Sequence, residues 1–395
     1  MKPWSAKLPP LSGRALTGIG AGALVGSFYI GTGDITFTRS PESGRINVGC
    51  YRQMVQGPKR VGMYCSPGKH GLLDREAWWA RGEPAPVAAI WGLDPLLFMV
   101  AATTFPKNVS EYDAFGGIGD APIDLFESDV TGLMLSANAE SIVEGYCYPG
   151  RDFAEGPFGE YMGYYGAIHM DPVFTCTAIT MRKDALYQTL QHGTAFVLDQ
   201  TDSACITQMR IEADAMKILR SAVREPIAAY LRPTGGGSNA LRISIKQHMV
   251  GEARNAIAAL FGGLRQLKHV WVYDEDVDIR NETQVDWAFG TRFQADQDIV
   301  MLTGIMGMPM DPSLQGRRTG AKAGFDCTRP FGRNEEIPLT RCAAKVFGGA
   351  ARFQTVEQAL QSEPMFFSHV VEAIGSEDGR DVACALDELR EGGRL

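Results

Sequence analysis

The sequence contains no apolar run long enough to span a bilayer. Its longest uncharged apolar stretch, 16–29, is interrupted by glycines and is shorter than the roughly 20 residues that a transmembrane helix needs. Lys2 and Lys7 are followed by Pro9 and Pro10, where a secretory signal would need apolar residues. We therefore expect no membrane span and no export, and we predict a cytoplasmic location.

Positive charge and paired cysteines are also scarce. No run of Lys and Arg exceeds two residues and the formal net charge is −8, which argues against nucleic acid as a partner. The 8 cysteines form no C-x-x-C pair, so we expect reduced thiols rather than a zinc knuckle or a disulfide framework. The sequence also has no Walker loop, no G-x-G-x-x-G after a strand and no G-x-S-x-G. Nucleotide hydrolysis, dinucleotide binding and acyl-enzyme chemistry therefore lose support.

The chain has 395 residues, 45% of them hydrophobic and 21% charged, and this predicts a globular protein of two or three domains. The first two hundred residues are β-rich, with short segments typical of a meander or barrel. We predict strands at 33–39, 46–55, 60–65, 86–91 and 133–136, a hairpin between the first two, and a helix at 74–81.

From about residue 202, longer helices alternate with strands, which is typical of an α/β layer domain. We predict helices at 212–223, 252–264 and 282–293, strands at 241–246, 270–273 and 299–302, and loops at 233–239 and 304–324. Three further helices are predicted near the C-terminus, at 356–360, 364–374 and 381–390.

Two carboxylates, Glu155 and Glu160, flank a Gly-Pro turn that can bring both side chains toward one cavity. Like-charge repulsion and burial raise the pKa of one member of such a pair, which can then donate a proton while the other stays ionised and orients a cation. An ordinary solvated turn is the alternative.

Asn47, Arg52 and His70 are a second candidate group. Their spacing on one strand would place Asn47 and Arg52 on opposite faces unless a bulge intervenes. An amide oxygen, an imidazole and a carboxylate would suit manganese or magnesium, completed by a phosphate. His70 by itself also fits a hydrogen-bonded structural histidine.

An acidic cluster, 274–278, follows the apolar strand 270–273, and the carboxyl ends of strands in α/β sheets commonly bind ligands. Helix capping and loop solvation explain the same residues equally well.

The candidate groups belong to motifs that together resemble those of the UbiD-like decarboxylases. The motifs are Asn47-Val48-Gly49-x-Tyr51-Arg52, Lys69-His70-Gly71, Asn108-Val109-Ser110-Glu111-Tyr112, Ala137-Asn138-Ala139-Glu140, Glu155-Gly156-Pro157-Phe158-Gly159-Glu160 and Asp274-Glu275-Asp276-Val277-Asp278. The resemblance runs in order from about Tyr29 to Arg390. These enzymes use prenylated FMN, held through its phosphate by manganese and potassium ions, to decarboxylate aromatic or α,β-unsaturated acids reversibly.

This resemblance implies a mixed α+β fold. A β-rich split-barrel domain that binds the flavin is expected at 1–205, an α/β layer domain at 206–333, and a C-terminal helical segment for oligomerisation at 334–395.

The resemblance also assigns roles to single residues. It implies that Asn47, His70 and Glu111 are the manganese ligands. It further implies a Glu-Arg-Glu network in which Arg52 keeps Glu155 ionised and Glu160 donates the proton. The other residues that it implies bind the cofactor are Val48, Gly49, Arg52, Lys69, Thr103, Thr104, Phe105, Pro106 and, more weakly, Lys268.

The implied reaction is a reversible, non-oxidative decarboxylation through a covalent adduct of the substrate with prenylated FMN. Loss of carbon dioxide from an sp² carbon leaves electrons that no conjugated orbital accepts, and the modified flavin provides that acceptor. Two other functions stay open, an FMN-dependent oxidoreductase and a non-catalytic subunit of a multi-subunit (de)carboxylase.

The same resemblance indicates the partners. We expect a small aromatic or unsaturated carboxylic acid as substrate and a flavin prenyltransferase as supplier of the cofactor. Relatives usually have a further N-terminal α/β segment before the region that begins here near Pro3, and they often continue beyond Leu395. We expect a homo-oligomer, either a dimer or a hexamer, or a partner subunit that replaces the N-terminal segment.

Overall fold

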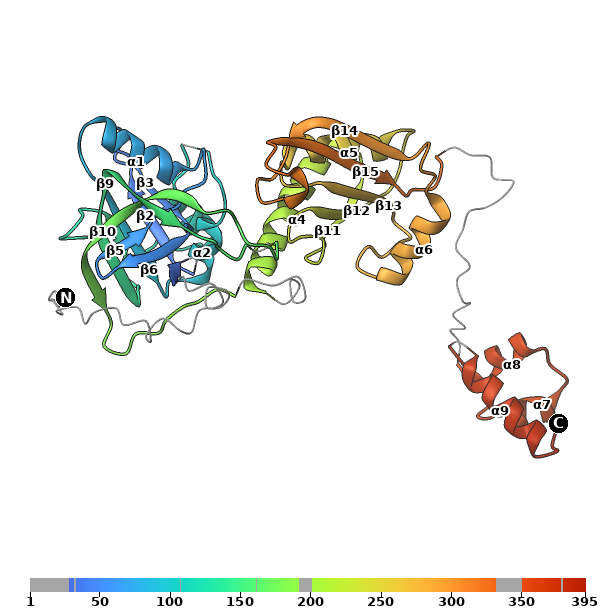
Figure 1. The fold of residues 1–395 in the computed structure, drawn as a ribbon. Coiled ribbons are helices and arrows are strands. Elements are labelled where there is room, and N and C mark those ends of the chain that lie inside the picture. Colours follow the sequence, from blue (N-terminus) through green and yellow to red (C-terminus); the bar gives the residue numbers. More distant parts are fainter. Residues whose placement is uncertain are drawn as a thin grey trace. The chain divides into compact units, whose positions relative to one another are not determined.

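The computed structural model describes residues 28–31, 33–106, 108–160, 162–191, 201–331, 350–377 and 379–395. The chain divides into two compact units, Met1–Phe331 and Gly332–Leu395, and we describe each by itself. Figure 1 shows that the first unit contains a β-rich region followed by an α/β region.

The β-rich region is built on an eight-stranded sheet with the order β1-β4-β5-β10-β9-β6-β2-β3. All neighbouring strands pair antiparallel. The strands are β1 (Tyr29–Gly31), β2 (Ile35–Arg39), β3 (Ile46–Gly49), β4 (Gln53–Gly57), β5 (Arg60–Gly62), β6 (Ala85–Trp91), β9 (Ser141–Glu155) and β10 (His169–Met181).

Hydrogen bonds between strands that are not neighbours show that this sheet is curled. Gln53 Nε2 of β4 donates to Thr36 Oγ1 of β2 at 2.9 Å. Trp91 Nε1 of β6 donates to the carbonyl oxygen of Ile30 in β1 at 2.8 Å. The curl closes the sheet into a half-barrel, which confirms the expected β-rich split barrel within a mixed α+β fold.

Helices and a small two-stranded sheet accompany the half-barrel. They are α1 (His70–Ala80), α2 (Pro95–Ala101), α3 (Glu111–Gly119), β7 (Leu125–Glu127) and β8 (Met134–Ser136). The helix predicted at 74–81 begins four residues earlier, at His70, with Lys69 as an N-cap whose side chain makes no capping hydrogen bond. Asp74 is therefore a helix-interior residue and not the N-cap that its residue type indicated.

Two strand predictions in this region are wrong. The predicted hairpin exists, because β2 and β3 pair antiparallel, but its second strand ends at Gly49 instead of continuing to Val55. The long pair β9 and β10 was not predicted at all. Its polar side chains and its interior glycines and prolines hide the alternation of buried and exposed residues that marks a shorter strand.

The α/β region has a five-stranded sheet with the order β11-β12-β13-β15-β14, which confirms the predicted α/β layer. The three central strands pair parallel and the two edge strands antiparallel. The elements are α4 (Asp202–Ala222), β11 (Pro226–Leu231), β12 (Ala240–Ile245), α5 (Glu252–Gly263), β13 (His269–Asp274), α6 (Glu282–Arg292), β14 (Ile299–Met306), η3 (Pro312–Leu314) and β15 (Thr319–Asp326).

Two boundaries in this region differ from the prediction. The first helix begins at Asp202, ten residues before Glu212, and Thr201 caps it by accepting a hydrogen bond from the backbone N–H of Ala204. The predicted loop 304–324 is in part strand, because β14 continues to Met306 and β15 begins at Thr319. Glycines at both ends of this segment led the prediction toward a loop, whereas antiparallel pairing holds them in a sheet.

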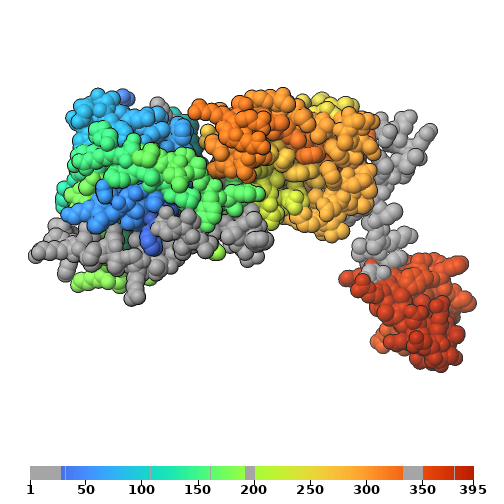
Figure 2. All heavy atoms as spheres, viewed as in Figure 1, coloured from blue at the N-terminus to red at the C-terminus, as the bar shows by residue number. Residues whose placement is uncertain are grey.

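The C-terminal unit contains three predicted helices, α7 (Val356–Ser362), α8 (Phe367–Ile374) and α9 (Arg380–Glu391). They share a small core to which Val370, Val371 and Val382 contribute. Figure 2 shows these residues, in red, as a compact body. Among the residues that the structure describes, no helix is long and apolar enough to cross a membrane.

Asp34, between β1 and β2, is 0% exposed, and burial raises the pKa of its carboxyl from 3.8 to about 7. A pKa that is higher in the folded than in the unfolded state adds stability at low pH, and this stability is lost as the pH rises through the folded-state value.

We expect Asp34→Asn to remove this pH dependence. The free energy of unfolding of the parent should fall relative to the variant between about pH 4 and pH 7, by up to about 1.4 kcal/mol per pH unit, and then level off. Urea denaturation at several pH values measures the difference. The exposed Asp129→Asn is the matched control, and a pH-independent offset for Asp34→Asn would contradict the expectation.

Candidate active site

Two candidate residues that are close in sequence, Asn47 and Arg52, lie at strands that are far apart in the order of the sheet. Asn47 lies in β3, whereas Arg52 lies just before β4 and forms an isolated bridge with Tyr64. The expectation that Asn47 and Arg52 share one strand is therefore wrong. Only the curl of the half-barrel keeps β3 and β4, at different positions in the sheet, within one site.

Arg52 joins the two predicted carboxylates. Its Nη2 lies 2.5 Å from Glu155 Oε2 and its Nη1 lies 2.7 Å from Glu160 Oε1. Glu155 is the last residue of β9 and is 0% exposed, and Glu160 lies beyond the Gly-Pro turn with 15% of its side chain exposed. The turn thus brings both carboxylates to one cation and is not an ordinary solvated turn.

Aromatic rings enclose the Arg52 guanidinium. Its central carbon lies 4.3 Å from the centroid of the Tyr64 ring and 4.8 Å from that of Phe158. Tyr29 packs edge-on against Phe158, with centroids 4.7 Å apart, and its hydroxyl donates to Glu155 Oε1 at 2.7 Å. Glu155 therefore accepts a hydrogen bond from the charged Arg52 at Oε2 and one from the neutral Tyr29 hydroxyl at Oε1.

The environment of Glu160 favours its protonated form. Burial raises the pKa of Glu160 above its ordinary value, and the negative charge of Glu155 raises it further, while Arg52 opposes both effects. A carboxyl group in this position can hold a proton at higher pH than a solvated glutamate and deliver it to a substrate atom.

For the second predicted group, Tyr51 links Asn47 to the backbone beside His70. The Tyr51 hydroxyl accepts hydrogen bonds from Asn47 Nδ2, at 3.4 Å, and from the backbone N–H of Gly71, at 3.0 Å. Asn47 in β3 is thereby linked to the first turn of α1, where His70 lies. Gly49 and Gly71 both need to lack a side chain here, because a Cβ would meet the Tyr51 ring or hydroxyl within 3.0 Å.

Glu111 reaches the same place from α3, of which it is the first residue. It is 2% exposed, and burial raises the pKa of its carboxyl, opposed in part by Arg45 and by a hydrogen bond from the backbone N–H of Val48. Its Oε2 accepts no hydrogen bond from any described residue, and Arg45 Nη1 lies 3.7 Å away.

These donors fit a hard cation. Asn47 uses its Nδ2 toward Thr38 and Tyr51, which leaves the amide oxygen as the group to offer, and Glu111 Oε2, which accepts no hydrogen bond from the described residues, is a second oxygen that could serve as a ligand. No group of three or more His, Cys, Asp and Glu side chains within the described ranges could hold a metal. Of the three predicted ligands, only His70 and Glu111 are of these types. A metal ion held by this set would therefore need the Asn47 amide oxygen as its third ligand.

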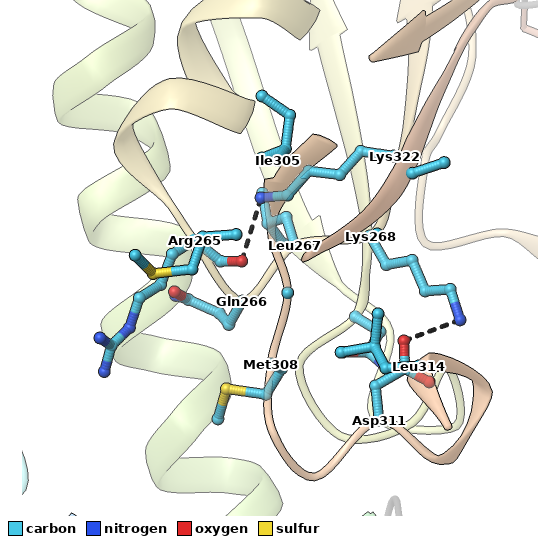
Figure 3. Close-up of a pocket in the computed structure, with 14 residues that line it drawn as sticks. Arg265, Gln266, Leu267, Lys268, Ile305, Met308, Asp311, Leu314 and Lys322 are labelled. Carbon is cyan, nitrogen blue, oxygen red and sulfur yellow. Dashed lines mark hydrogen bonds and ion pairs between the residues drawn. The ribbon is translucent and has the colours of Figure 1, made fainter. Parts of the chain in front are cut away.

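The residues predicted to contact the cofactor lie in two places. Lys69 precedes α1, and its Nζ donates to Thr104 Oγ1 at 3.2 Å, which ties the loop Thr103, Thr104, Phe105 and Pro106 to this end of the site. Lys268 lies in the α/β region, where its Nζ is 2.8 Å from Asp311 Oδ2 and 2.6 Å from Ser313 Oγ. Figure 3 shows this pair in a pocket that Arg265 and Lys322 also line.

The acidic cluster 274–278 is largely neutralised from within the α/β region. Arg292 Nη1 lies 3.1 Å from Asp274 and its Nη2 lies 2.7 Å from Asp276, and Arg329 Nε lies 3.3 Å from Asp274. These ion pairs explain the cluster without a ligand.

Sequence reasoning gave no role to Tyr29, Tyr51 or Tyr64, which the structure places around the predicted residues. Tyr29 and Glu155 are 126 positions apart, and only the curl of the sheet brings them together. The spacing of residues along the chain cannot reveal this contact, whereas knowledge of which strands pair would reveal it.

We expect Arg52→Met to destabilise the protein by roughly 3–5 kcal/mol, because it leaves the fully buried Glu155 without its cation. Chemical denaturation measures this loss. Arg182→Met is the matched control, since the Arg182 side chain is 53% exposed in its pair with Glu140 and should change stability by less than about 1 kcal/mol. Equal effects of the two substitutions would mean that the Arg52 network contributes no more than a surface ion pair.

Two family models match the chain. The 3-octaprenyl-4-hydroxybenzoate carboxy-lyase Rift-related domain matches residues 26–195, and the C-terminal domain of the same carboxy-lyase matches residues 205–327. These ranges cover both the half-barrel and the α/β region.

Solved structures agree with these matches. The UbiD-class enzyme HmfF from Pelotomaculum thermopropionicum, in complex with FMN, has 31% identity and a TM-score of 0.75 over 80% of this chain and 69% of its own. An evolved dimeric form of HmfF, in complex with prenylated FMN, has 29% identity and a TM-score of 0.68 over 79% and 68%. The vanillic acid decarboxylase of Sedimentibacter hydroxybenzoicus, in its open form, has 27% identity and a TM-score of 0.70 over 85% and 70%.

Proposed function

The chain belongs to the UbiD family of carboxy-lyases, and from this premise we propose that it reversibly decarboxylates an aromatic, heteroaromatic or α,β-unsaturated carboxylic acid with prenylated FMN as cofactor. The observation that carries the proposal is the bridge from Arg52 to both Glu155 and Glu160. This bridge supports the proposal because it holds two carboxyl groups at one cation, and one of them, Glu160, has a raised pKa suited to donating a proton.

Decarboxylation replaces a carboxylate with hydrogen and therefore consumes one proton. Glu160, with its raised pKa, is the proposed donor, and Arg52 orients it through the 2.7 Å ion pair. Glu155 accepts hydrogen bonds from Arg52 Nη2 and from the Tyr29 hydroxyl, and these bonds hold the guanidinium toward the site. In the carboxylation direction Glu160 takes the proton back.

Prenylated FMN, when bound, supplies the conjugated acceptor for the electrons that departing carbon dioxide leaves on carbon. We propose that Asn47, His70 and Glu111 hold a manganese ion that, with potassium, binds the cofactor phosphate. The buried Glu111 Oε2, which accepts no hydrogen bond from the described residues, supports this assignment.

Val48, Gly49, Arg52, Lys69 and the loop Thr103, Thr104, Phe105 and Pro106 are the proposed contacts of the flavin. The hydrogen bond between Lys69 and Thr104 supports a shared role of the two segments. For Lys268 the support is weaker, because Asp311 already pairs with its ammonium group.

Two relatives bear on the substrate and the assembly. The Sedimentibacter enzyme acts on vanillic acid and its name covers C and D components, and one HmfF form is dimeric. We propose a small aromatic acid as the first substrate class to test, and a homo-oligomer or a partner subunit as the assembly. The cytoplasmic location, the flavin prenyltransferase and the domain boundaries at 205 and 333 stay predictions.

We expect Glu160→Gln to reduce decarboxylation by roughly 100-fold or more, because general acid catalysis contributes about 10²–10⁴ in rate. Flavin content should stay at the parental level, since the amide can still accept from Arg52. Carbon dioxide release and absorbance of the bound flavin measure both quantities. The exposed Glu42→Gln is the matched control, and a variant that decarboxylates at the parental rate would exclude Glu160 as the acid.

Mass spectrometry of the released flavin tests the cofactor separately. Protein co-expressed with a flavin prenyltransferase and supplied with manganese should release prenylated FMN. Plain FMN at full occupancy would favour the oxidoreductase, and activity that needs a second protein would favour the non-catalytic subunit.

A further inference from the structure

Strand β2 presents two buried threonines on one face. Ile35 and Phe37 point into the hydrophobic cluster under α2, whereas Thr36 and Thr38 alternate with them and point to the other face of the sheet. Thr36 is 0% exposed and Thr38 is 2% exposed. Buried hydroxyl groups need hydrogen-bond partners. Each of the two threonine hydroxyls accepts from a side-chain amide and donates to an aspartate.

Thr38 connects Asn47 to a carboxylate. Its Oγ1 accepts a hydrogen bond from Asn47 Nδ2 at 3.0 Å and donates to Asp74 Oδ2 at 2.7 Å. Because Thr38 donates its proton to Asp74 in α1, its lone pair faces the asparagine. Asn47 is thus held with its side-chain nitrogen on Thr38, which fixes the orientation of its amide oxygen.

Thr36 repeats this arrangement two residues earlier. Its Oγ1 accepts from Gln53 Nε2 at 2.9 Å and donates to Asp34 Oδ2 at 3.0 Å. Asp34 and Gln53 are both 0% exposed, and Gln53 follows Arg52 directly in the chain. The amide of Gln53 therefore fixes the main chain that carries the Arg52 guanidinium.

The two threonines hold the two ends of one segment. Asn47 and Gln53 enclose the crossing from β3 to β4, and these strands lie at different positions in the sheet order, so no pairing between them sets their distance. Residues two apart on a strand are about 6.6 Å apart. Pairing of β2 with β3 already places Thr38 opposite Asn47, and the hydrogen bond from Gln53 to Thr36 ties β4 to the same strand, so a ladder of two threonines on β2 gives the two ends a fixed spacing.

We propose that Thr36 and Thr38, each backed by an aspartate, are positioning residues that set the separation between the metal-binding end of the site, at Asn47, and its acid–base end, at Arg52. The roles of the two ends rest on the proposed function. The hydrogen bonds that join the two ends to β2 are independent of the proposed function.

The proposal predicts that two isosteric variants change different properties of the protein. Thr38→Val should weaken Mn²⁺ binding by roughly 10-fold or more, as loss of a group that orients a metal ligand does, and leave the Arg52 end in place. Thr36→Val should leave Mn²⁺ affinity within about 2-fold, lower kcat by roughly 10-fold and speed hydrogen exchange of the amides at 50–53. Thr36→Ser and Thr38→Ser retain the hydroxyl and should restore each property.

The experiment uses the full chain. Mn²⁺ titration followed by electron paramagnetic resonance gives the affinity, and hydrogen exchange and thermal unfolding are measured on the same samples. Thr131→Val is the matched control, because the buried Thr131 hydroxyl donates to Glu144 at 2.8 Å outside both groups, and it should lower stability only. If Thr36→Val and Thr38→Val behave like Thr131→Val, or change metal affinity and hydrogen exchange together, the proposal is wrong.

Failure of the proposed function would look different. A parent protein without decarboxylase activity would remove the kcat comparison, whereas Mn²⁺ affinity and hydrogen exchange would still test the ladder. Loss of the difference between the two variants in those two measurements, with an active parent, would overturn the ladder and leave the proposed reaction standing.

Discussion

The buried charge of Arg52 is the constraint on which the proposed site depends. A guanidinium group that is 6% exposed requires negative charge beside it, and Glu155 and Glu160 supply it from the two sides of one turn. One cation cannot compensate two anions in a buried place. Burial raises the pKa of Glu160, the negative charge of Glu155 raises it further, and Arg52 only partly offsets both effects. The packing thereby makes Glu160 the better candidate of the two for a proton donor.

This arrangement needs the curl of the half-barrel. Arg52 enters from the start of β4, Glu155 from the end of β9 and Tyr29 from β1, and a flat sheet would keep β9 and β1 far apart in the strand order. The bonds from Gln53 to Thr36 and from Trp91 to Ile30 join strands that are not neighbours and so maintain the curl. The same short segment, 47–53, then serves both the proposed metal ligand and the proposed acid network.

The sequence predicted those parts of the molecule that local signals determine. The α/β alternation beyond residue 202 and the carboxylates beside the Gly-Pro turn were visible in periodicity and spacing. Glu111 came only from the family motif, because a glutamate that begins a helix has an ordinary capping role. The β9 and β10 pair, the break at 50–52 and the contact of Tyr29 with Glu155 depend on long-range pairing, which a single sequence does not display.

Within the described ranges, buried polar atoms without a hydrogen-bond partner occur in both regions of the first unit, and in the α/β region they include Arg232 Nε, Asn239 Oδ1 and His269 Nδ1. In the α/β region the buried Lys322 donates to backbone carbonyls and the buried Arg242 pairs with Glu282, so both cations have partners. In the half-barrel, Asp34 Oδ1, Arg45 Nη1, Arg52 Nε, Gln53 Oε1 and Glu111 Oε2 lack hydrogen-bond partners among the described residues. Such atoms cost stability unless water, a proton or a ligand completes their bonding. Arg45, Arg52 and Gln53 lie within the segment 45–53, so part of this cost falls on the segment that carries the proposed metal ligand and the proposed acid network.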